Sequence, residues 1–205
     1  MASAQPSTAK RAQVQAAVLQ ATEDLLAQGG SFADLKIERI ASGAGISRTA
    51  FYFYFRDKRE LLMRLCEDVT SALYEEADVW FSGETMTAAE VKDALMRVAG
   101  LYADHGPLLR AITEVATYDE ELAGFWRALL QRFADATSKR IESEQAAGRA
   151  AEMAAVPTAF SLVWMTERTL YEHMVQSGGA ELEALVDAMA GIWTRAVYGR
   201  VPSAG

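Results

Sequence analysis

Hydrophobic residues recur at the spacing of an amphipathic helix along most of the chain, and no stretch alternates between apolar and polar residues as a strand would. Val14, Val18 and Leu25 lie on the first such stripe, which stops at the glycines of positions 29 and 30. The pattern therefore predicts an all-α fold of about nine helices. The later helices are expected over residues 35–43, from 47, over 57–83, 87–105, 108–116, 120–145 and 157–177, and from 181.

A short turn joins the second and third of these helices. The second helix ends at Gly43, where we expect the glycine to take a left-handed cap conformation. Residues 44–46 form the turn, and Ser47 follows as an N-cap because its hydroxyl can accept a free amide proton two or three residues on. Two short helices joined in this way are a helix-turn-helix.

The third helix begins with side chains that suit the major groove of DNA, which admits a helix and displays donors, acceptors and thymine methyl groups. The amides of its first turn, from Ser47, suit a phosphate oxygen. Arg48 can reach a guanine edge or a phosphate, and Thr49 and Ala50 can lie against a thymine methyl group. We predict that these residues contact double-stranded DNA.

Aromatic residues follow in two sets with different roles. Phe51 and Phe55 are four residues apart and should point inward. Tyr52 and Tyr54 should present their hydroxyls to the DNA backbone, and Lys58 adds a cation beside them. Tyr52, Tyr54 and Lys58 are therefore predicted to contact phosphates.

The net charge of −8 is unfavourable for DNA binding, but it is distributed unevenly along the chain. Residues 1–62 hold 8 Lys or Arg against 6 Asp or Glu, whereas the remaining residues hold 12 against 22. The cation excess thus falls in the segment that contains the helix-turn-helix. A cluster of this size is also common on solvated surfaces, so the turn and the hydroxyl and aromatic spacing are needed to favour DNA.

The segment GISRTAFYFYFRDKREL, residues 45–61, resembles the DNA-binding signature of TetR-type transcriptional regulators. Two further segments, TERTL at residues 166–170 and IWTRAVYG at 192–199, resemble the branch that contains the mycobacterial ethionamide-resistance repressor. One departure is at Leu35 and Lys36, where the family usually has a small hydroxyl residue that contacts a phosphate. Lys36 is expected to make that contact by another route.

Aromatic residues are numerous in the helices after residue 90, and they can be explained in two ways. They can simply form a core, or they can line a cavity. The resemblance favours the cavity, because an aromatic-lined tunnel runs through this part of the fold in the ethionamide-repressor branch. Carried over by position, its lining falls on Val98, Tyr102, Trp126, Leu130, Phe133, Val163, Thr166, Tyr171 and Trp193.

The last two helices, from about Pro157 and from Glu181, have unusually broad apolar arcs. Such helices need cover on more than one side. They can form a buried hairpin in a monomer or pair with the same two helices of a second chain in a four-helix bundle. The family resemblance favours the homodimer.

Two domains follow from these assignments. Residues 1–56 are predicted to form the helix-turn-helix domain, with Met1 to Thr8 as a mobile arm or a solvated tail. Residues 57–205 are predicted to bind a ligand and to dimerise, and they open on a long helix where Asp57 and Glu60 have the spacing of a capping box.

The predicted function is a ligand-responsive transcriptional regulator, most simply a repressor that a small apolar effector releases from its operator. The alternative is a carrier or an enzyme that uses the cavity without DNA. The sequence contains no phosphate loop, nucleophile elbow or zinc-ligand spacing, so we expect no enzyme activity and no cofactor. His105 and His173 have no cysteine or carboxylate cluster beside them, which argues against a metal site. Without an apolar run as long as a membrane span or a signal peptide, we expect a cytoplasmic protein.

Overall fold

A computed structural model describes residues 8–82 and 87–199, and within those ranges it contains helices and no strand. The all-α prediction is confirmed, because the described residues form nine α-helices and one π-helix, η1. The arm predicted over Met1 to Thr8 lies, up to residue 7, outside the described residues. The elements are α1 (Thr8–Ala27), α2 (Ile37–Gly43), α3 (Arg48–Phe51), α4 (Lys58–Ser82), α5 (Ala88–Asp104), α6 (Gly106–Ala116), α7 (Glu120–Ala146), α8 (Ala155–Leu170), η1 (Tyr171–Gln176) and α9 (Leu182–Tyr198).

The chain forms two compact units, and neither is continuous in sequence. The first unit contains residues 1–68 and 107–123, and the second contains residues 69–106 and 124–205. The first unit therefore takes in the start of α4, all of α6 after its first residue, and the start of α7. The functional division at residue 56 stays a prediction, and the compact units do not follow it.

Close approach between α1 and α2 organises the first unit. A Cβ atom built on Gly43 would lie 3.0 Å from the Cβ of Ala21, so this position has almost no room for a side chain. The left-handed conformation that we expected at Gly43 is instead found at Gly45, with φ 69°. Gly43 is thus needed for helix packing, and Gly45 makes the turn.

The start of α4 is capped differently from a complete capping box. The Glu60 amide donates to Oδ1 of Asp57 over 2.8 Å, as predicted. The Glu60 carboxylate, however, accepts from the amide of Arg56 over 2.7 Å. The return bond therefore reaches one residue further back than the spacing predicts, and it fixes the turn that leads into α4.

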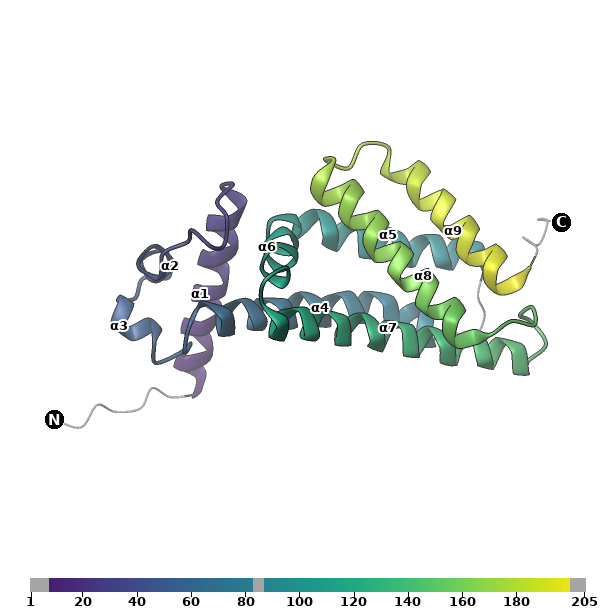
Figure 1. Cartoon of the computed structure of the whole chain (residues 1–205), viewed down its shortest axis with the longest axis horizontal. Coiled ribbons are helices and arrows are strands. Elements are labelled where there is room, and N and C mark those ends of the chain that lie inside the picture. Colours follow the sequence, from purple (N-terminus) through teal and green to yellow (C-terminus); the bar gives the residue numbers. More distant parts are fainter. Residues whose placement is uncertain (1–7, 83–86, 200–205) are drawn as a thin grey trace. The chain divides into compact units, whose positions relative to one another are not determined.

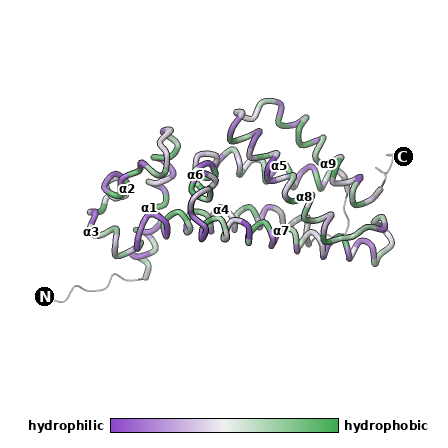
Figure 2. Tube along the Cα trace, viewed as in Figure 1, coloured by the Kyte–Doolittle hydropathy of each residue, from purple (hydrophilic) through white to green (hydrophobic). Residues whose placement is uncertain are grey.

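The second unit is built on contacts among α5, α8, η1 and α9. Helices α5 and α9 pack together, and α8 lies beside α9 (Figure 1). Along α7, hydrophilic and hydrophobic residues alternate in short groups, which is typical of a helix with one buried face (Figure 2). Within the described ranges, no helix is both long enough and apolar enough to cross a membrane.

Candidate nucleic-acid interface and internal cavity

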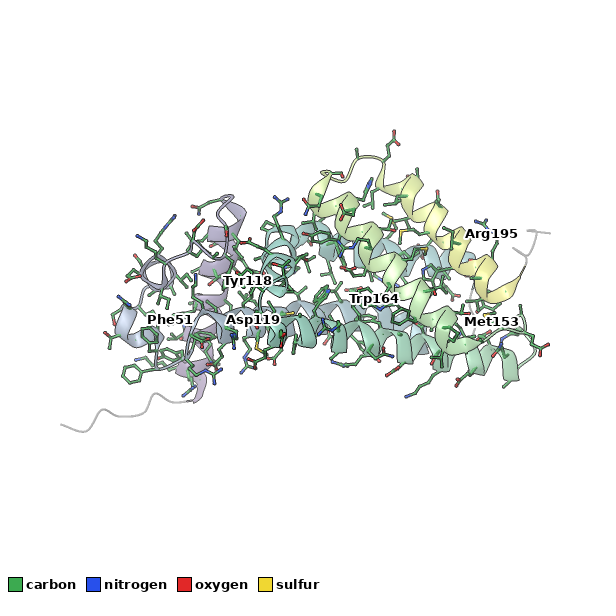
Figure 3. The ribbon with its side chains drawn as sticks, viewed as in Figure 1. Phe51, Tyr118, Asp119, Met153, Trp164 and Arg195 are labelled. Atoms are coloured by element: carbon green, nitrogen blue, oxygen red, sulfur yellow. The ribbon has the colours of Figure 1, made fainter. Side chains whose placement is uncertain are left out.

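Ser47 starts α3 as the sequence predicted. Its side-chain oxygen accepts a hydrogen bond from the amide of Ala50 over 3.1 Å. Phe51, labelled in Figure 3, and Phe55 are 0% and 1% exposed, and their ring centroids lie 5.5 Å apart. The prediction that they point inward is therefore confirmed. These two rings anchor α3 to the first unit and leave the opposite side of the helix open.

The open side carries most of the predicted DNA contacts. Arg48 and Thr49 are exposed, Ala50 and Tyr54 are half-buried, and Tyr52 is 46% exposed. The structure thus brings the residues predicted between positions 47 and 54 onto one short accessible segment.

The same segment carries Phe53, which is 73% exposed. It was not predicted as a contact, although an aromatic residue between two outward tyrosines was a signal available in the sequence.

Two arginines near this segment are held by exposed carboxylates. A nitrogen of the Arg48 guanidinium lies 2.7 Å from an oxygen of Glu38 in α2, and the two side chains are 60% and 54% exposed. Arg56 lies 3.6 Å from Asp57, again at the surface. Exposed ion pairs contribute only about 0–1 kcal/mol, so a phosphate or a base can replace either carboxylate at small cost.

Lys58 is held far more firmly than these arginines. Its ammonium donates to the backbone carbonyls of Phe32, Ala33 and Leu35 over 2.8–2.9 Å. Partial burial lowers the pKa of Lys58, but the three carbonyls use all three of its donors. The predicted phosphate contact stays untested, while this geometry gives Lys58 a positioning role for the loop that leads into α2.

We expect Lys58→Ala to lower the free energy of unfolding by about 1–3 kcal/mol, because three backbone carbonyls lose a charged donor. Urea unfolding followed by circular dichroism measures this change. Arg56→Ala is the matched control, since the Arg56 side chain is 72% exposed, and it should change the free energy by less than about 0.5 kcal/mol. Equal stability of the two variants would contradict the positioning role.

Arg59 forms ion pairs with two carboxylates at the start of α7. Its Nε atom lies 2.6 Å from Oδ2 of Asp119, and a second guanidinium nitrogen lies 2.9 Å from Glu121. Asp119 also accepts hydrogen bonds from the amides of Glu121 and Leu122, so it caps α7 (Figure 3). These contacts explain why residues 107–123 belong to the first unit.

Lys36 occupies the N-cap position of α2 and makes no side-chain capping bond. Its side chain is exposed. The absence of a capping hydroxyl at this position agrees with the departure seen in the sequence. Whether Lys36 contacts a phosphate remains a prediction.

A cavity of about 90 Å³ lies in the second unit. Eight of the nine residues carried over from the family line it, from Val98 on α5 to Trp193 on α9. Tyr171 does not line it. Tyr171 is instead the buried first residue of η1, and its hydroxyl accepts from Gln176 over 2.8 Å. The part of α8 that lines the cavity ends at Glu167, and Tyr171 lies beyond it.

Several residues that line the cavity were not predicted from the sequence. Most are aliphatic and lie on stripes that the periodicity assigns simply to the core, so nothing in the sequence marks them as cavity residues. Glu167 is different, because a charged residue within the otherwise apolar α8 was a visible signal. The missed residues are Leu73, Val91, Ala94, Leu95, Leu129, Thr137 and Glu167.

An accessible helix-turn-helix at the start of an all-helical chain defines a DNA-binding transcriptional regulator. Residues 18–65 match the family described as bacterial regulatory proteins, tetR family, and residues 91–199 match the C-terminal domain of the transcriptional regulator EthR. The chain belongs to the TetR family of transcriptional regulators, which are not enzymes.

Individual relatives agree with this assignment. The chain is 32% identical to the HTH-type transcriptional regulator EthR of Mycolicibacterium smegmatis (strain ATCC 700084 / mc(2)155), over 98% of this chain and 92% of the relative. Its fold resembles a TetR-family regulator from Syntrophomonas wolfei str. Goettingen, with a TM-score of 0.73 and 19% identity over 93% and 96% of the two chains. It also resembles AibR, solved in complex with isovaleryl coenzyme A and operator DNA, with a TM-score of 0.66 and 16% identity over 87% and 97%.

Proposed function

We propose that this regulator is a repressor that binds a palindromic operator as a homodimer and is released when a small, largely apolar effector occupies the cavity. The cavity is the observation that carries the proposal. Protein interiors are close-packed and contain few voids larger than a water molecule. An apolar cavity lined from α4, α5, α7, α8 and α9 is therefore a candidate binding site.

The exposed segment of α3 supports operator binding. Arg48 and Thr49 can reach base edges once Glu38 gives way, and the hydroxyl of Tyr52 can donate to a phosphate. AibR, which has a similar fold, was solved with operator DNA and an acyl coenzyme A. That structure offers a precedent for operator and ligand binding by one such fold, although it does not identify a ligand for this chain.

Exposed apolar residues support the homodimer. Among the described residues of the second unit, the large hydrophobic side chains classed as exposed are Val156, Phe160 and Ile192, at 62%, 48% and 41%. All three lie on α8 and α9. A second copy of the same two helices would cover them in a four-helix bundle, and a two-fold axis would present two copies of α3 to half-sites about 34–36 Å apart.

A carrier that uses the cavity without DNA remains the alternative. It would leave the accessible segment from Ser47 to Tyr54 without a role, and nothing observed in the structure favours it.

Binding to a DNA fragment from the promoter of the chain's own gene tests the proposal. Affinity measured at 50 and 200 mM salt should fall steeply, by about 10³-fold or more if six or more phosphates are contacted. Sedimentation of the complex should show an even number of chains per operator. A fragment bound by single chains, or with an affinity that salt does not change, would contradict the proposal.

In the same assay, we expect Arg48→Ala to lower the affinity for the operator by about 5- to 150-fold, because a base contact contributes about 1–3 kcal/mol of discrimination. The affinity for a scrambled fragment should fall much less. Arg127→Ala, an exposed arginine on α7, is the matched control for loss of one positive charge. Equal weakening of both DNA fragments would place Arg48 on a phosphate instead of a base.

A further inference from the structure

The cavity lining contains one ionisable side chain with a carboxylate oxygen that has no hydrogen-bond partner. Glu167 on α8 is 4% exposed and lines the cavity, and its Oε2 atom has no hydrogen-bond partner. The Arg168 guanidinium, with its Nε 3.8 Å from that oxygen, is beyond hydrogen-bond distance and is itself 54% exposed. A buried carboxylate oxygen without a partner is costly, so a ligand donor that reaches it makes an interaction that the empty cavity lacks.

Two threonines add further polar atoms to the same lining. The Thr137 hydroxyl is buried without a hydrogen-bond partner. The Thr166 hydroxyl accepts from the indole nitrogen of Trp193 over 2.9 Å, which leaves its own proton to be donated. The rest of the lining is almost entirely apolar side chains, so the unsatisfied groups are few and definite.

We propose that the effector carries a hydrogen-bond donor, with a protonated amine as the strongest case, that binds Oε2 of Glu167 while an apolar body fills the remainder of the cavity. The inference rests on the proposed function, because it describes the ligand of that same cavity. A carboxylate ligand of the same size is disfavoured, because its negative charge would lie beside that of Glu167 in a poorly solvated space.

A cationic ligand would change the charge state that burial favours for Glu167. Burial raises the pKa of Glu167, which means that the empty cavity disfavours the carboxylate form. Burial also raises the pKa of Tyr102, which lines the same cavity, and so keeps that hydroxyl neutral. A bound cation would restore the carboxylate form of Glu167 and gain a charge-assisted hydrogen bond.

The test uses the full chain and four probes with a short apolar body: hexylamine, hexan-1-ol, pentyl methyl ether and hexanoate. The first three have the same number of heavy atoms, so they differ mainly in the donor. Titration calorimetry at one pH and one salt concentration should show hexylamine binding at least about tenfold more tightly than the ether. The ether donates no hydrogen bond, and a tenfold difference corresponds to about 1.4 kcal/mol, the lower end of what a hydrogen bond to a charged group contributes. Hexan-1-ol should lie between them, and hexanoate should bind most weakly.

Glu167→Gln removes the charge and keeps the shape of the side chain. It should lower the affinity for hexylamine at least tenfold and change the affinity for the ether by less than twofold. Glu172→Gln is the matched control, because Glu172 is 58% exposed and pairs with Arg168 outside the cavity lining. It should leave all four affinities within twofold. Circular dichroism shows whether each variant is folded, and the order of the probes on the unaltered chain tests the proposal even if Glu167→Gln does not fold.

Equal binding of amine and ether to the unaltered chain would overturn the donor proposal. If neither probe then binds to a variant with a filled cavity, such as Val163→Trp, the cavity is still the effector site of the proposed function. Failure of all four probes to bind would overturn the donor proposal as well. Operator binding is measured separately, so the DNA-binding part of the proposed function is judged by its own assay.

Discussion

Under the proposed function, Val163→Trp is expected to stay folded and dimeric but to bind operator about 5- to 150-fold more weakly than the unaltered chain. Val163 is 8% exposed and lines the cavity, so an indole there occupies the space proposed for the effector. Overpacking a filled interior costs about 1–3 kcal/mol. If the operator-binding conformation bears that cost and the effector-bound conformation does not, the free energy of operator binding weakens by up to the same amount.

This expectation depends on α4, whose residues up to Asp68 belong to the first unit and whose Leu73 lines the cavity in the second. Ala128→Trp adds the same indole at an exposed position of α7 and should leave operator affinity unchanged. Fluorescence anisotropy with a labelled operator measures both variants. Normal operator binding by a Val163→Trp chain whose crystal structure shows the indole in the cavity would place the effector site elsewhere.

Glu144→Ala should lower the free energy of unfolding by about 3–5 kcal/mol, because it removes a buried carboxylate that pairs with two guanidinium groups, one of them itself buried. Glu144 is 1% exposed and lies 3.0 Å from the guanidinium of Arg140, which is 9% exposed. Its two oxygens also accept hydrogen bonds from Arg149 over 2.8 and 3.0 Å. Glu142→Ala, at an exposed position of the same helix, should change the free energy by less than about 0.5 kcal/mol.

The difference between Glu144→Ala and the unaltered chain should depend on pH in a defined direction. Hydrogen bonds from Arg149 lower the pKa of Glu144 below its ordinary value of 4.5. The folded state therefore binds this proton more weakly than the unfolded state, and the contribution of Glu144 is present above pH 4.5 and lost as the pH falls through the folded value. Chemical unfolding at pH 7 and pH 4 should show the gap between the two chains narrowing, and a gap that widens on acidification would contradict the ion-pair explanation.

Local signals allowed much of the fold to be predicted from the sequence. Ser47 caps α3 because a serine hydroxyl needs only the amides of its own first turn. The glycines at 29 and 30 end the first helical stripe for an equally local reason, and α1 ends at Ala27. Helix α6 begins at Gly106, two residues before the expected Leu108, because a proline in the first turn of a helix loses no intrahelical hydrogen bond.

Contacts between residues distant in sequence were not predictable in this way. Lys58 was assigned to a phosphate, but its ammonium reaches carbonyls 23–26 residues earlier in the chain. Nothing in the pattern of charges shows that this ammonium turns inward while Arg48 stays exposed. Glu167 was not predicted to line the cavity. It matters because it is buried, and a single charged residue within an apolar helix does not show from the sequence alone that it is buried.

Most of the cavity lining could be predicted by position. Val163 and Thr166 lie in regular α-helix and line the cavity as the resemblance implies. Tyr171 is buried outside the lining, because the part of α8 that lines the cavity ends at Glu167. Where the cavity ends depends on packing between helices that are distant in sequence, which the spacing of residues along one helix does not show.

The discontinuous make-up of the two compact units has a practical consequence for protein engineering. A hybrid regulator made by joining residues 1–68 to the body of a relative would leave behind residues 107–123, which belong to the same unit. Arg59 would then face the relative's residue at the position of Asp119, whose Oδ2 now lies 2.6 Å from the Nε of Arg59. Exchange of operator specificity between such proteins should therefore transplant two separate sequence segments together, or else only the exposed residues of α3.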